Sequence, residues 1–120
     1  MWRDAAWVLD MLNACRRVLE YAEGLSEATF LSNTRDQDAI LRQLTIAGEA
    51  AKGVSQEFRA AHPEIPWKQV AGFRDVAVHG YRRVDLKEVW RIVQEDVGPL
   101  RAALVPLVPP QDEPDSDESE

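Results

Sequence analysis

The sequence predicts an all-α fold, an antiparallel bundle of four main helices plus one short helix. Apolar residues recur at spacings of three and four along four long segments, which is typical of helices with one buried face. No segment alternates apolar and polar residues for long enough to suggest a strand. A chain of 120 residues suits one domain with one core, and we expect the helical domain to span residues 1–108.

The first helix is predicted from one apolar stripe that ends near Gly24, because glycine commonly terminates helices. The stripe consists of Val8, Met11, Leu12, Cys15, Val18, Leu19 and Ala22. A short turn of helix is expected from Ser26 to Leu31. The longest helix is then expected to begin at Thr34, which fits a capping box with Gln37.

That longest helix carries a second stripe, formed by Ile40, Leu44, Ala47, Ala51, Val54 and Phe58. Ala47 and Gly48 are small enough to let another helix approach closely. Pro63 and Pro66 block continuation of the helix, and Pro66 can begin the next one.

The next predicted helix runs from about Trp67 to His79, with Gly80 as its stop. Asp85 and Glu88 then give a capping-type start to the last stripe, in which Pro99 is expected to introduce a kink. That stripe consists of Leu86, Val89, Trp90, Val93, Val97, Leu100 and Leu104.

The net charge of −7 is concentrated at the C-terminus, where QDEPDSDESE holds six of the 21 acidic residues. Without these ten residues, 14 basic side chains face 15 acidic ones, a net charge of −1. We expect residues 109–120 to form a disordered acidic tail. A nearly neutral domain lacks the strongly basic surface of a general nucleic-acid binder. A local basic patch and a solvated face with scattered charges both remain open for Arg74, Arg82, Arg83, Lys87 and Arg91.

Cys15 is the only cysteine, so no intramolecular disulfide can form, and we expect a cytoplasmic protein. Its apolar neighbours favour a buried residue over a nucleophile. The start MWRDAAWVLD does not resemble a signal peptide, and charges interrupt every apolar segment, so we expect no membrane-spanning helix. Four tryptophans are many for this length, which favours a homodimer that covers part of the surface.

Residues 73–85, FRDVAVHGYRRVD, contain one of the two histidines and one of the two tyrosines. In a continuous helix, Asp75 and His79 share a face, so the carboxylate could orient the imidazole. Arg74 lies about 140° around the axis from His79. The two would converge if Arg74 reaches around, if the helix ends at the histidine, or if a second chain completes the site. Tyr81 is expected on a loop.

This set of groups suits transesterification at an RNA phosphodiester. The imidazole of His79 could remove the proton from a ribose 2′-hydroxyl, and the guanidinium of Arg74 could stabilise charge on the phosphate. The reaction requires no metal, and the sequence offers little to hold one. The structural alternative is that these polar residues only complement the carbonyl dipoles at a helix C-terminus.

The motif R-x4-H-x-Y, present in RDVAVHGY, resembles the signature of HepT-like toxins of the HEPN superfamily. The resemblance covers residues 3–105 and includes EYAEGLS, IAGEAAKGVSQEFRAAHPEIPW and GYRRVDLKEVW. It implies a metal-independent endoribonuclease without a cofactor, active as a homodimer, with Arg74 and His79 as the catalytic pair and Asp75 as a supporting polar residue. It also implies a partner, an MNT-type nucleotidyltransferase antitoxin, that uses ATP to convert Tyr81 to O-AMP-tyrosine.

Three features depart from the family pattern. Asp75 stands where relatives often have Asn, and its carboxylate could repel substrate phosphate. Arg82 and Arg83 replace the usual aromatic residue and glycine, and they are candidate RNA-binding residues that could offset this charge. The acidic tail is either a solubilising end or an RNA-mimicking segment that shields the cleft.

Two other functions remain open. One is a non-catalytic helical dimer that binds and regulates a partner nucleotidyltransferase. The other is a small-ligand-binding bundle, for which the sequence offers no polar cluster besides this motif.

Overall fold

The computed structural model describes residues 2–78 and 83–109, except for the side chain of Trp2. Within these residues the protein is all-α, as predicted, with seven α-helices, one 3-10 turn and no strand. The elements are α1 (Trp2–Ala22), α2 (Glu27–Ser32), α3 (Thr34–Gly53), α4 (Gln56–Ala61), α5 (Trp67–Ala77), α6 (Leu86–Glu95), α7 (Val97–Leu104) and η1 (Val105–Leu107). The predicted domain boundary at residue 108 and the disorder of the tail stay predictions, because residues 110–120 lie outside the described part.

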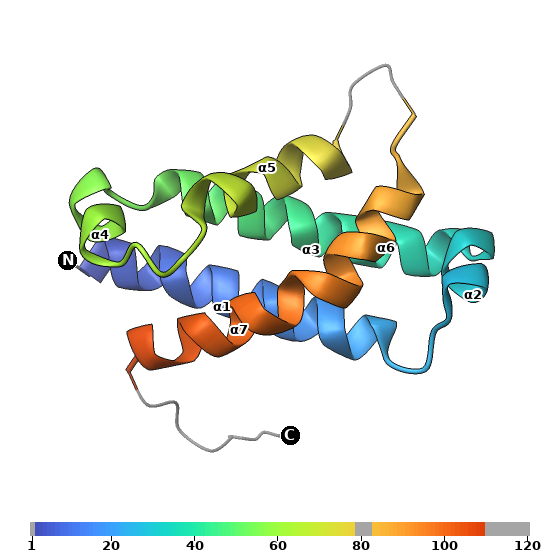
Figure 1. The fold of residues 1–120 in the computed structure, drawn as a ribbon, viewed down its shortest axis with the longest axis horizontal. Helices are drawn as coiled ribbons and strands as arrows, with labels where there is room; N and C mark the ends of the chain where they lie inside the picture. The colour runs from blue at the N-terminus through green and yellow to red at the C-terminus, as the bar shows by residue number, and fades with distance from the viewer. Residues whose placement is uncertain (1, 79–82, 110–120) are drawn as a thin grey trace.

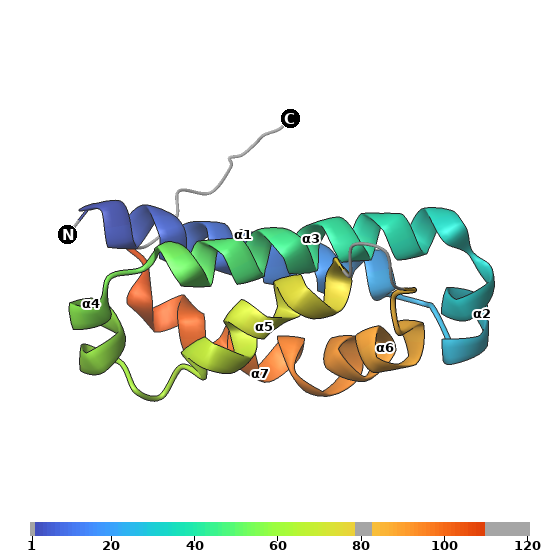
Figure 2. The same cartoon turned by 90° about the horizontal axis from the view of Figure 1, so that it is seen from above.

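The helices form two layers (Figures 1 and 2). The antiparallel helices α1 and α3 make one layer, and α5, α6 and α7 make the other. Helix α5 runs antiparallel to α3, and the α6–α7 arm returns in the opposite direction to α5. The short helices α2 and α4 lie at opposite ends of the molecule. The predicted antiparallel course therefore holds, but the described residues form seven helices rather than the expected five, because two predicted helices are each divided, into α3 and α4 and into α6 and α7.

The second long helix ends at Gly53, well before the HPEIP segment at which the sequence predicts its end. Val54 is extended, with φ −70° and ψ 140°, and Ser55 begins α4 by accepting a hydrogen bond from the Phe58 N–H. The apolar spacing continues across this break because Val54 remains buried and Phe58 half-buried after the chain changes direction. The side-chain cap at Ser55 thus begins a new helix at a point where the apolar spacing alone predicts one continuous helix.

The start of α3 also differs from the prediction of a capping box at Thr34. Asn33 is the N-cap, and its side chain accepts a hydrogen bond from the Asp36 N–H. Gln37 instead donates from its side-chain amide to the carbonyls of Phe30 and Leu31, which ties α3 back to α2. Helix α3 has 20 residues and α1 has 21, so α3 is not the longest helix.

The interruption expected at Pro99 lies earlier, at Asp96, where α6 gives way to α7. Proline clashes with the carbonyl of the residue four positions before it and cannot donate a hydrogen bond. For Pro99 that residue is Glu95, the last residue of α6. The position of the break therefore follows from the proline ring.

Other boundaries agree with the sequence. Helix α1 ends at Ala22 and Gly24 has a φ of 81°, a conformation that favours glycine. Ser26 caps α2, and Asp85 caps α6 by accepting a hydrogen bond from the Glu88 N–H. Cys15 is buried, and burial raises the pKa of its thiol to about 12, as expected for a core residue rather than a nucleophile.

Each of the three tryptophan side chains that the structure describes, Trp7, Trp67 and Trp90, has contacts within the monomer. The Trp67 indole donates a hydrogen bond to the His62 carbonyl, and Trp90 stacks on Phe30 with ring centroids 5.2 Å apart. Trp7 lies against Gly53 and keeps 38% of its surface exposed. The homodimer stays a prediction.

Helices α3 and α5 approach each other closely at Gly48. A Cβ atom on Gly48 would lie 2.6 Å from the backbone nitrogen of Arg74 and 3.1 Å from the carbonyl oxygen of Ala71. Real Cβ atoms do not tolerate the first distance, so only glycine allows this packing. The close approach expected at this residue is confirmed.

We expect Gly48→Ala to lower the free energy of unfolding, because the obstacle to the added Cβ is the backbone of α5 and the cost of moving it lies toward the upper end of about 1–3 kcal/mol. The better helix propensity of alanine offsets about 1 kcal/mol of this cost, which leaves a net loss of about 1–2 kcal/mol. Gly72→Ala is the matched control on α5, since nothing lies within 4 Å of its Cβ position, and it should stabilise by about 0.5–1 kcal/mol. Urea denaturation measures both, and a Gly48→Ala protein as stable as the wild type contradicts the packing constraint.

A second prediction concerns Asp4, a buried carboxylate that joins α1 to the start of α4. The backbone N–H and then the hydroxyl of Ser55 donate hydrogen bonds to it, both at 2.8 Å, and lower the pKa of Asp4 below its ordinary value of 3.8. A lowered pKa stabilises the fold above the unfolded-state value, and this contribution is lost as the pH falls through the folded-state value.

The difference in melting temperature between wild type and Asp4→Asn should therefore be largest near neutral pH and shrink below pH 3.8. Thermal unfolding followed by circular dichroism at a series of pH values measures it. Asp10→Asn, an exposed change on the same helix, is the control. A difference that stays constant into strongly acidic solution contradicts the prediction.

Candidate active site

Helix α5 carries the first half of the motif and ends before its second half. Its last residue is Ala77, and Val78 is extended, with φ −131° and ψ 103°, while its N–H still donates to the Arg74 carbonyl. The predicted continuation of this helix to His79, with Gly80 as its stop, is wrong. The β-branched Val78 favours the extended conformation that it adopts here.

This early end removes the basis for placing Asp75 and His79 on one helical face. His79, Tyr81 and Arg82 lie outside the described residues, so their predicted roles stay predictions. Arg83 is described, and it is exposed in the irregular segment that leads to α6. Arg74 and Asp75 lie within the last turn of α5.

The guanidinium of Arg74 lies at the seam between α3 and α5. Its Nε is 3.8 Å from a carboxylate oxygen of Glu49 on α3, and its Nη1 is 3.8 Å from Oδ1 of Asp75. The same Asp75 oxygen is 3.8 Å from Nζ of Lys52, also on α3. We call Glu49, Lys52, Arg74 and Asp75 the α3–α5 charge cluster.

The α3–α5 charge cluster is net neutral and exposed to solvent. Its ion pairs are long, and surface pairs of this kind contribute only about 0–1 kcal/mol to stability. The side chains are therefore available for a ligand. Sequence reasoning missed Glu49 and Lys52, although both belong to the GEAAKG stretch that begins with Gly48.

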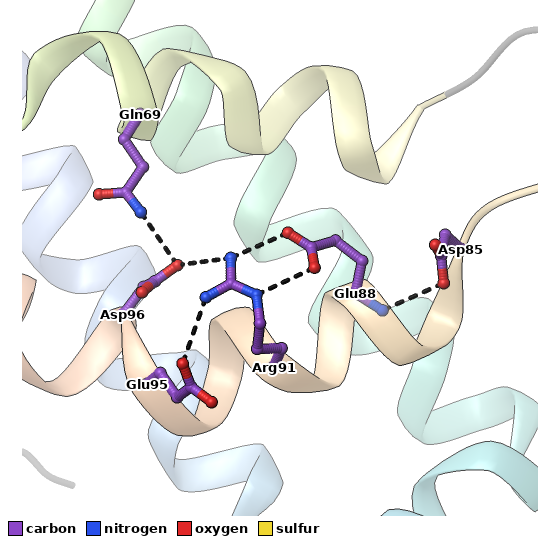
Figure 3. A network of polar contacts seen from close by, with 6 residues as sticks. All are labelled: Gln69, Asp85, Glu88, Arg91, Glu95 and Asp96. Carbon is purple, nitrogen blue, oxygen red and sulfur yellow. Dashed lines mark hydrogen bonds and ion pairs between the residues drawn. The ribbon is translucent and has the colours of Figure 1, made fainter.

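Arg91 differs from Arg74, although both side chains are 40% exposed. Figure 3 shows the Arg91 guanidinium surrounded by the carboxylates of Glu88, Glu95 and Asp96. It donates two hydrogen bonds to Glu88, at 2.9 and 2.8 Å, and a third to Asp96 at 3.2 Å. Gln69 of α5 also donates to Asp96.

These contacts make Arg91 a structural residue at the junction of α6 and α7. The hydrogen bonds with Glu88 raise the pKa of Arg91 further above its ordinary value, and the same bonds lower the pKa of Glu88. The local basic patch considered from the sequence therefore does not include Arg91 as an available cation. Its charge is compensated by acidic residues.

The second histidine, His62, lies elsewhere and has structural contacts. Its ring packs on Phe58 with centroids 4.4 Å apart, and its Nδ1 is 3.3 Å from Glu64. It follows α4 as the C-cap residue of that helix. Among the helices of residues 2–78 and 83–109, none is long and apolar enough to cross a membrane.

Comparison with known proteins shows a consistent similarity over most of the chain. Residues 11–107 match the family described as "Ribonuclease HepT-like". A protein named "Probable ribonuclease HepT" from Thermococcus cleftensis is 36% identical over 92 residues, which cover 77% of this chain and 84% of the relative. A "Putative RNase" of Methanocaldococcus jannaschii is 32% identical over 96 residues, covering 80% of this chain and 88% of the relative. No solved structure significantly matches the chain.

Proposed function

The chain belongs to the ribonuclease HepT-like family, and we propose that it is a metal-independent endoribonuclease that acts as the toxin of a toxin–antitoxin pair. The observation that carries this proposal is the family match over residues 11–107, which includes the motif RDVAVHGY. The relatives named as ribonucleases support the RNA substrate. The proposed active form is a homodimer in which the two motifs line a shared cleft.

In the proposed reaction, the ribose 2′-oxygen attacks the adjacent phosphorus and the bond to the 5′-oxygen breaks. His79 accepts the proton of the 2′-hydroxyl, and the leaving 5′-oxygen takes up a proton. Arg74 stabilises the negative charge that develops on the phosphate oxygens. A guanidinium suits this task because its donors match two phosphate oxygens at once.

The contacts of Arg74 support this role. Among the described residues its guanidinium makes two ion pairs at 3.8 Å, beyond hydrogen-bonding distance, whereas the Arg91 donors already bind carboxylates at 2.8–3.2 Å. A substrate phosphate can therefore bind Arg74 without breaking short hydrogen bonds. The same phosphate would have to disrupt a dense network to reach Arg91.

We propose that an MNT-type nucleotidyltransferase neutralises the protein by adenylylating Tyr81. The tyrosine oxygen attacks the α-phosphorus of ATP and pyrophosphate leaves. The added nucleotide brings negative charge and bulk to the motif that also contains Arg74, the residue proposed to bind the RNA phosphate. Modification would then exclude the substrate.

The alternative function is a non-catalytic dimer that binds and regulates such a nucleotidyltransferase. One observation favours it: Glu49 and Asp75 both lie close to Arg74, so the α3–α5 charge cluster has no net positive charge. Cleavage assays separate the two functions, because only the ribonuclease requires Arg74 and His79 for turnover.

We expect Arg74→Ala and His79→Ala each to lower kcat/KM for RNA cleavage by about 10²–10⁴-fold, in the presence of a chelator. Cleavage of a fluorescently labelled RNA by protein unmodified at Tyr81 measures this loss. His62→Gln and Arg17→Ala are matched controls and should retain activity. Wild-type protein that leaves RNA intact contradicts the ribonuclease function, and cleavage that persists in both variants places the site elsewhere.

The modification gives a separate prediction. Co-expression with the nucleotidyltransferase should add one adenylyl group to the wild type and none to Tyr81→Phe, as measured by intact-protein mass spectrometry. Tyr21→Phe is the matched control, because Tyr21 is the other tyrosine and is exposed on α1. An adenylyl group found on Tyr81→Phe protein refutes the assignment.

A further inference from the structure

Asp75 joins two cations that come from different helices. Its Oδ1 lies 3.8 Å from Nζ of Lys52 on α3 and 3.8 Å from Nη1 of Arg74 on α5. The two nitrogen atoms can therefore lie no more than twice that distance apart. Both cations thus lie near one carboxylate, which carries the same single negative charge as a phosphodiester.

We propose that Lys52 is a second phosphate-binding residue of the site, and that Lys52 and Arg74 together bind one RNA backbone. This inference rests on the proposed ribonuclease function. It adds a contact between the RNA and α3, a helix that contributes no residue to the motif RDVAVHGY. Arg74 stabilises the reacting phosphate, and Lys52 holds the strand beside it.

The backbone at Lys52 is well fixed, which suits a binding residue. Lys52 lies in the last turn of α3, and its carbonyl accepts a hydrogen bond from Nη2 of Arg59 at 3.0 Å. Nε of Arg59 also donates to the Val54 carbonyl at 3.1 Å. The same helix packs closely against α5 at Gly48. The Lys52 side chain thus extends from a rigid frame.

The side chain of Lys52 is nevertheless available to a ligand. It is 51% exposed and the Asp75 side chain is 67% exposed, and their ion pair is long enough for a phosphate to replace it at little cost. Lysine acts as a point charge toward phosphate, so it needs no fixed orientation of the strand. Loss of the Lys52 charge is therefore expected to weaken RNA binding and to leave the rate of the chemical step nearly unchanged.

The test compares Lys52→Ala with Arg17→Ala, which removes one positive charge from an exposed position on α1. Binding of a short single-stranded RNA is measured in the cleavage-deficient His79→Ala background at several salt concentrations. Lys52→Ala should weaken binding about 3- to 10-fold and reduce the slope of log K against log[salt] by about 0.7. Arg17→Ala should change neither quantity.

Kinetics and stability provide further readouts. With His79 present, Lys52→Ala should raise KM about 3- to 10-fold and leave kcat within about twofold, and Lys52→Arg should restore KM. The melting temperature should stay within about 4 °C of the wild type.

The possible outcomes distinguish a failure of the Lys52 inference from a failure of the proposed ribonuclease function. If wild-type protein cleaves RNA but Lys52→Ala matches Arg17→Ala in affinity and salt slope, the role of Lys52 is overturned and the ribonuclease function stands. If the His79→Ala protein does not bind RNA and the wild type does not cleave it, the site and the proposed function fail together.

Discussion

The close contact between Gly48 of α3 and the backbone of α5 is the constraint on which the candidate site depends. Because a Cβ atom at residue 48 would meet the backbone nitrogen of Arg74 at 2.6 Å, the last turn of α5 must lie directly against α3. The Arg74 side chain consequently emerges at the seam of the two helices, where it pairs with Glu49, and the neighbouring Asp75 pairs with Lys52. The absence of a Cβ atom at Gly48 thus determines which α3 residue lies beside Arg74, the proposed catalytic arginine.

Arg91 and Arg74, both in the second layer, show that an arginine can either stabilise the fold or remain available to a ligand. Arg91 binds three carboxylates with short contacts and holds together the junction between α6 and α7 (Figure 3). Arg74 makes only long ion pairs among the described residues, and the acidic partners offset its charge without saturating its donors. Because the α3–α5 charge cluster has no net charge, the proposed ribonuclease function requires a substrate phosphate to displace the Asp75 carboxylate from Arg74.

Much of the fold follows from the sequence, and the errors have a common physical origin. The all-α class and the helix ends at Gly24 and Asp85 were predicted from local signals, namely the φ > 0 preference of glycine and side-chain capping. The breaks after Gly53 and before Val97 were not placed correctly, because Val54 and Val97 remain in the core on the far side of each break. Apolar spacing reports burial, and a chain can change direction without leaving the core.

The sequence by itself determined the residues of the motif, their order and the family they indicate, since these are properties of a local string. It also determined that Gly48 permits a close helix approach. Only the tertiary structure decided that Glu49 pairs with Arg74 and Lys52 with Asp75, that Arg91 is occupied by acidic residues, and that α5 ends at Ala77. The physical reason is that helical periodicity fixes neighbours within one helix, whereas contacts between helices depend on how closely the two backbones pack.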